Sequence, residues 1–65
     1  MKLQELMTEK RYKAKEIAEV CGVTQSAVTH WLNGSNMPSV ENLQKIAKEF
    51  NVTIDELLED GNDAG

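Results

Sequence analysis

Four side chains in the middle of the chain carry amide, hydroxyl or imidazole groups, which form hydrogen bonds without a full charge. They are Gln25, Ser26, Thr29 and His30. Because a helix has about 3.6 residues per turn, this spacing places all four on one face. The other face is apolar, with Ala27, Val28, Trp31 and Leu32. A face exposed only to water more often carries Lys and Glu, so this one predicts a surface that recognises a hydrogen-bonding partner.

The edges of DNA bases in the major groove are a partner of this kind. Glutamine can bond to both N6 and N7 of adenine, and serine can pair with several base edges. The methyl group of Thr29 can pack on thymine, and His30 can donate to guanine or to a phosphate. A solvated surface histidine is the alternative interpretation of His30. No Cys, Asp or Glu lies beside it at ligand spacing, so we expect no metal and no cofactor.

The residues before this helix meet the steric demands of a tight helix-turn-helix. Ala18 is small where two helices must cross, and Gly22 follows four positions later, where the turn needs a left-handed residue. The apolar anchors of the two helices are Ile17, Cys21, Val23, Val28 and Trp31. This combination predicts a helix-turn-helix over residues 14–34. A generic two-helix corner inside a bundle is the alternative.

The remaining segments also follow a helical pattern, so we expect an all-α, compact five-helix bundle. The first helix should cover about residues 2–10, and Thr24 should cap the third. Ser39 should cap a fourth helix, and a capping box over residues 53–56 should open a fifth that includes Leu57 and Leu58. The expected core stripe of the fourth helix is Val40, Leu43, Ile46, Ala47 and Phe50.

A chain of 65 residues is long enough for one domain, which we place at residues 1–60, with a flexible acidic tail at 61–65. No apolar run approaches the roughly 20 residues that a membrane span needs. The lone Cys21 lies on an apolar helical face, which predicts a buried packing thiol and fits a reducing cytoplasm.

The net charge of −4 is unevenly distributed. Residues 1–54 hold seven basic residues and six acidic ones, a net charge of +1, whereas residues 55–65 hold five acidic residues and no basic one. No Lys, Arg, Asp or Glu stands between Glu19 and Glu41. A surface that lies against phosphates must exclude carboxylates, so this gap favours contact with nucleic acid. A short buried stretch would also lack charges.

The chain resembles the lambda-repressor/Cro-like (XRE-type) helix-turn-helix family over about residues 2–58. The resemblance depends on the segments 16–24, 25–28, 31–34, 38–39 and 50–57. It implies a five-helix bundle that binds double-stranded DNA, commonly as a two-fold homodimer on a palindromic operator. Gln25, Ser26 and His30 match family positions that touch base edges. The start of the second helix and the loop after the third match positions that touch phosphates.

These matches, with side-chain chemistry, give five candidate phosphate contacts. They are Lys13, Lys15, Asn33, Ser35 and Asn36, and the amino end of the fourth helix is a further candidate. The family commonly opens its second helix with Thr or Ser followed by Gln, whereas this chain has Lys13 and Ala14. We expect a lysine to replace the missing contact. The expected dimer interface is Val52, Ile54, Leu57 and Leu58.

We therefore expect a cytoplasmic, sequence-specific transcription regulator of bacterial or phage type, acting as a repressor. The alternative is a protein-interaction module of the same fold, such as an antitoxin or anti-activator, with the acidic tail as the contact to a protein partner. The sequence shows no paired carboxylates, no nucleophile with a base and no Gly-rich phosphate loop, so we do not expect an enzyme.

Overall fold

Five helices follow one another in the computed structural model, which describes residues 1–59. They are α1 (Leu3–Lys10), α2 (Ala14–Cys21), α3 (Gln25–Leu32), α4 (Val40–Phe50) and α5 (Ile54–Leu58). Residues 1–59 contain no strand, so the predicted all-α class is confirmed. The tail predicted at residues 61–65 lies outside the described residues. Within them, no helix has the length and apolar character needed to cross a membrane.

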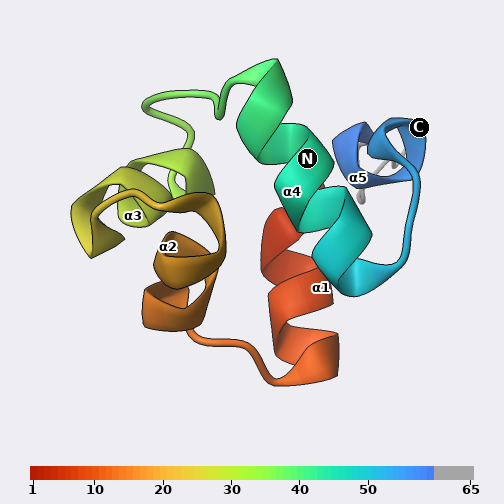
Figure 1. Cartoon of the computed structure of the whole chain (residues 1–65), viewed down its shortest axis with the longest axis horizontal. Coiled ribbons are helices and arrows are strands. Elements are labelled where there is room, and N and C mark those ends of the chain that lie inside the picture. The colour runs from red at the N-terminus through yellow and green to blue at the C-terminus, as the bar shows by residue number, and fades with distance from the viewer. Residues whose placement is uncertain (60–65) are drawn as a thin grey trace.

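The helices form two neighbouring groups that meet at α4. Figure 1 shows α2 and α3 together on one side of the molecule, and α1, α4 and α5 on the other. The central helix α4 packs against both α2 and α5. The pair α2 and α3 is therefore held by the bundle behind it, while the outer side of α3 faces away from the other helices.

Every helix contributes a fully buried side chain to one core. These side chains are Leu3 of α1, Ile17 of α2, Val28 of α3, Ile46 and Phe50 of α4, and Leu57 of α5. No polar or charged residue is buried in the described part of the chain. Burial of apolar surface is thus what orients the five helices relative to one another.

Two expectations about individual apolar residues are wrong. Val40, predicted to belong to the core stripe of α4, is 67% exposed because it is the first residue of that helix. Figure 1 shows that this first turn extends past α1. Leu57, predicted to lie in a dimer interface, is fully buried inside its own chain. Its side chain is therefore not available to a second copy.

Hydroxyl side chains begin three of the helices, as predicted for Thr24, Ser39 and Thr53. Each Oγ accepts a hydrogen bond from a backbone N–H three residues later, at 3.2, 3.2 and 3.0 Å respectively. Such caps satisfy amides that have no partner inside the helix. At Thr53 this bond is one half of the expected capping box. The other half, from the Thr53 backbone N–H to the Glu56 side chain, is not formed among the bonds of residues 1–59.

Three helices end with the same backbone motif, in which the residue after the helix adopts a left-handed conformation. That residue is Arg11 after α1 (φ 61°), Gly22 after α2 (φ 71°) and Asn51 after α4 (φ 60°). The next residue donates its N–H to a carbonyl five positions back: Tyr12 to Met7 at 2.8 Å, Val23 to Ala18 at 3.0 Å, and Val52 to Ala47 at 2.9 Å. Glycine adopts this conformation freely and asparagine tolerates it, whereas other residues lose roughly 1–2 kcal/mol.

The two adjacent leucines of α5 test the division between core and surface. Leu57→Ala removes a fully buried side chain, so we expect the free energy of unfolding to fall by about 2–5 kcal/mol. Leu58 is 41% exposed, and Leu58→Ala should lower the free energy of unfolding by less than about 1 kcal/mol. Urea unfolding followed by circular dichroism measures both. Equal losses would contradict the placement of Leu57 in the core.

Candidate nucleic-acid interface

The four polar residues predicted on one face of α3 are all exposed and together line one shallow hollow. We call this surface, formed by Gln25, Ser26, Thr29 and His30, the recognition face. On the opposite side of α3, Val28 and Trp31 are buried. The predicted separation of polar and apolar side chains on this helix is therefore confirmed. Because no charged residue lines the hollow, it offers hydrogen-bonding and methyl groups only.

One of these four side chains is already engaged within α3. The Thr29 hydroxyl donates to the backbone carbonyl of Gln25 at 3.2 Å. This bond uses the only proton of the hydroxyl, so Thr29 can offer a partner its methyl group and an acceptor oxygen. Gln25, Ser26 and His30 make no side-chain hydrogen bond within residues 1–59, so their donors and acceptors face solvent.

Helix α2 fixes the position of α3 through its buried side, which consists of Ile17, Ala18 and Cys21. Cys21 is a free, buried thiol, as predicted, and its Sγ–H points at the backbone carbonyl of Asn42 in α4 at 4.0 Å. Burial raises the pKa of the Cys21 thiol, which keeps it protonated and poorly nucleophilic. The role of Cys21 is therefore to pack α2 against its neighbours.

The loop after α3 is tied together by its own polar groups. Asn33 Oδ1 accepts hydrogen bonds from the backbone N–H of Ser35 at 3.1 Å and from its hydroxyl at 2.8 Å. The same backbone N–H also donates to the carbonyl of His30 at 2.9 Å. The side-chain Nδ2 groups of Asn33 and Asn36 make no hydrogen bond within residues 1–59, and both residues are exposed. The loop thus presents two side-chain amides on a constrained backbone.

The start of α2 presents the two predicted lysines. Lys13 is the N-cap and Lys15 lies in the first turn, and both are exposed. The backbone N–H of Lys13 donates to Glu16 Oε1 at 2.7 Å, so Glu16 satisfies the amide that precedes the helix, while the Lys13 side chain provides no cap. Neither lysine forms an ion pair in the described part of the chain, where the two pairs are Lys2–Glu59 and Lys45–Glu41.

Tyr12 fixes the turn that leads into α2. Its hydroxyl donates to Glu49 Oε2 of α4, and its ring packs edge-on against Phe50, with centroids 5.0 Å apart and planes at 87°. The hydrogen bond to the Glu49 carboxylate holds the pKa of Tyr12 above its usual value of 10.0. The backbone that carries Lys13 is therefore attached to the end of α4.

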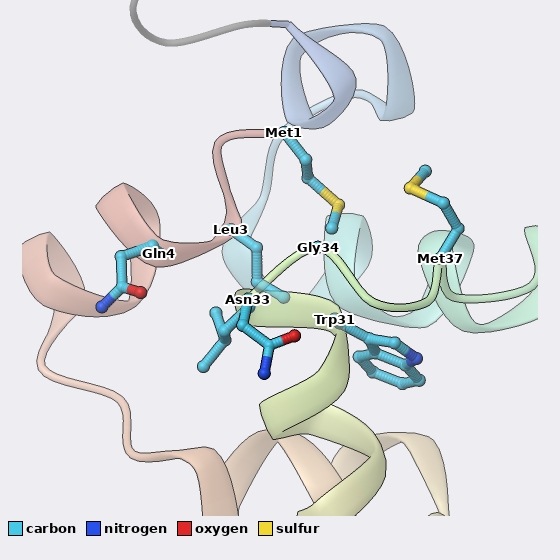
Figure 2. Close-up of a pocket in the computed structure, with 8 residues that line it drawn as sticks. Met1, Leu3, Gln4, Trp31, Asn33, Gly34 and Met37 are labelled. Atoms are coloured by element: carbon cyan, nitrogen blue, oxygen red, sulfur yellow. The ribbon is translucent and has the colours of Figure 1, made fainter.

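A second hollow, of about 270 Å³, lies between the N-terminus and the end of α3. Figure 2 shows Met1 and Met37 standing on either side of it, with Leu3 and Trp31 among the lining side chains. None of its lining residues belongs to the recognition face. Met37, beside the hollow, is 63% exposed, and Val40 lies three residues further along the chain. The sequence alone did not predict this surface, although Met37, an apolar residue in an otherwise polar loop, was a signal for it.

The structure brings together some of the predicted site residues and separates others. The recognition face is one surface, and Asn33 and Ser35 are bonded to each other. The proposed dimer set is not one surface: Leu57 is in the core, Val52 and Ile54 are half-buried against it, and Leu58 is exposed. No group of three metal-binding side chains comes together within residues 1–59.

Comparison with known proteins gives two matches. A helix-turn-helix family model matches residues 3–57. A protein described as the HTH-type transcriptional activator BcrR of Enterococcus faecalis is 44% identical over 57 residues, which are 88% of this chain and 28% of the relative. The chain therefore spans little more than a quarter of that relative's length. No solved structure matches.

The raised pKa of Tyr12 predicts how stability changes at alkaline pH. The folded chain binds the phenol proton more tightly than the unfolded chain, in which the pKa is near 10.0. The stability gained from this bond is therefore complete below about pH 10 and is lost as the pH rises through the folded pKa. Urea unfolding at rising pH should show a smaller alkaline loss of stability for Tyr12→Phe than for the wild type. Equal losses in both proteins would contradict the bond.

Proposed function

Because this chain belongs to the XRE-type helix-turn-helix family, whose members bind DNA and regulate transcription, we propose that it is a sequence-specific, cytoplasmic transcription regulator that reads duplex DNA. The recognition face carries this proposal. It joins four uncharged polar side chains on an exposed helix, and an α-helix fits the major groove, where each base pair shows a distinct set of donors, acceptors and methyl groups.

Each side chain of the recognition face can make a different kind of contact with DNA. Gln25 has an amide that can pair with both N6 and N7 of an adenine. The Thr29 hydroxyl already donates its proton to the Gln25 carbonyl, so we assign the Thr29 methyl group to a contact with a thymine methyl. Ser26 and His30 keep their donors and pair with base edges further along the same groove. Specificity then depends on amides, hydroxyls and a methyl group rather than on arginine.

Phosphate contacts before and after α3 in the chain would fix the position of α3 in the major groove. We assign Lys13 and Lys15, at the start of α2, to one stretch of backbone, and the side-chain amides of Asn33 and Asn36 to another. Ser35 receives a supporting role, because its hydroxyl donates to Asn33 and thereby orients the Asn33 amide toward an outside partner. The N-terminal turn of α4 lies next to this loop and offers further backbone N–H groups.

We further propose that two copies bind a palindromic operator. Three large apolar side chains remain exposed in the described chain, namely Met37, Val40 and Leu58, while Val52 and Ile54 stay partly accessible. Pairing of such surfaces about a two-fold axis would place two recognition faces in successive major grooves. Their half-sites would then lie about 34 Å apart along the duplex. The proposed interface keeps Val52, Ile54 and Leu58 of the expected dimer interface and leaves out Leu57, which is buried.

We propose repression as the effect on transcription, because occupying a promoter needs no surface beyond the one that binds DNA. Activation is the second candidate, since the relative that shares 44% identity is named an activator. A reporter that carries the bound site within its promoter distinguishes them by the direction in which output changes. A third reading, a protein-interaction module such as an antitoxin with its contact in the acidic tail, predicts that no DNA sequence is selected.

Selection from a pool of random duplexes, at low and at moderate salt, tests the proposal. We expect enrichment of a palindrome whose half-sites are one helical turn apart. Affinity should be modest and should fall only gently with salt, because few lysines are available to neutralise phosphates and each such contact adds about 0.9 to the slope. Absence of any enriched sequence at both salt concentrations would refute sequence-specific binding, and an enriched but asymmetric site would refute the dimer alone.

A single amide on the recognition face should set the preference at one base pair. Gln25→Ala should weaken binding to the selected site by about 1–3 kcal/mol and relax the preference at that position. Gln44→Ala is the matched control, since Gln44 is an exposed amide on α4 outside the recognition face. Binding titrations on a set of single-base variants measure the effect. A uniform loss on all sequences would mean that Gln25 contacts a phosphate instead.

A further inference from the structure

The three left-handed helix ends differ in how well their residue suits the backbone. Gly22 is the residue with no steric penalty at such a position, and Asn51 is one of the few others that tolerate it. Arg11 has neither advantage, yet it adopts the same conformation in the same hydrogen-bonded motif. Residues held in such sparsely populated backbone conformations cluster at functional sites.

The side chain of Arg11 has no structural task in the described part of the chain. It is exposed, and it takes part in neither of the two ion pairs nor in any side-chain hydrogen bond among residues 1–59. It is also the one arginine of the chain, and it lies in a run of six residues that holds Lys10, Lys13 and Lys15 as well. Four of the seven basic residues are thus collected at the turn between α1 and α2.

This turn is held firmly, so the backbone that carries these charged side chains has a defined position. Tyr12 closes the backbone motif with its N–H bond to Met7 at 2.8 Å, and its side chain is fixed by Glu49 and Phe50 of α4. Glu16, the acidic residue nearest in sequence after the turn, is bonded to the backbone of Lys13. Figure 1 shows the turn running from the end of α1 to the start of α2.

We propose that Arg11, presented by this strained and clamped turn, is a DNA phosphate contact that extends the interface beyond the helix-turn-helix. The inference rests on the proposed function, because it takes α3 to lie in the major groove. Arg11 is two residues from Lys13, so their Cα atoms are at most about 7 Å apart. Each strand of B-DNA carries one phosphate per roughly 3.4 Å of axis, so we assign the Arg11 guanidinium to a phosphate near the one assigned to Lys13.

The shared backbone motif supplies a matched pair of variants. Arg11→Gly and Asn51→Gly each place glycine at a left-handed helix end, and both should keep or raise the midpoint of thermal unfolding, because glycine adopts this conformation without steric cost. Only the first removes a charge at the turn. Arg11→Lys keeps the charge and serves as the rescue variant. Each protein, as the full 65-residue chain, is titrated with the duplex recovered by selection over a series of salt concentrations.

A plot of log affinity against log salt concentration has a negative slope, and Arg11→Gly should make it shallower by about 0.9, the value for one lost phosphate contact. The change should be the same for all DNA sequences. Asn51→Gly and Arg11→Lys should keep the wild-type slope. An Arg11→Gly protein with unchanged slope and affinity would overturn this assignment while leaving the proposed function intact. Failure of the wild-type chain to bind any duplex would overturn both together.

Discussion

Burial of one side of α3 against α2 is the interaction on which the candidate interface depends. Val28 and Trp31 enter the core, while Ile17, Ala18 and Cys21 present the side of α2 that receives them. A helix with a buried side has a fixed rotation, so the opposite side must face outward. Hydrophobic packing that carries no chemistry of its own therefore decides which polar groups a partner can reach.

The rest of the bundle makes this arrangement rigid. Core side chains from α1, α4 and α5 support α2 from behind, and Tyr12 attaches the turn before α2 to Glu49 and Phe50. The loop after α3 is fixed by the bonds between Asn33 and Ser35. A site that reads base edges gains from this rigidity, because an ordered surface loses less conformational entropy on binding.

The sequence predicted the helices, the two-sided character of α3 and the burial of Cys21, because these follow from local periodicity, capping residues and the left-handed position of Gly22. It failed at Val40 and Leu57, where the outcome depends on how far one helix extends past another and on which neighbour covers a side. Periodicity identifies an apolar side chain but not its partner. The left-handed conformation of Arg11 was also not foreseen, since a glycine at that position would have been the signal.

An NMR titration of backbone amides with a duplex tests the central claim most directly, because it locates the interface residue by residue. The account predicts that the largest shift changes fall on residues 25–30 of α3, with further changes at Lys13, Lys15 and the loop at residues 33–36. Changes concentrated on α4 and α5, with the amides of α3 unaffected at saturation, would contradict the claim that the uncharged face of α3 reads DNA.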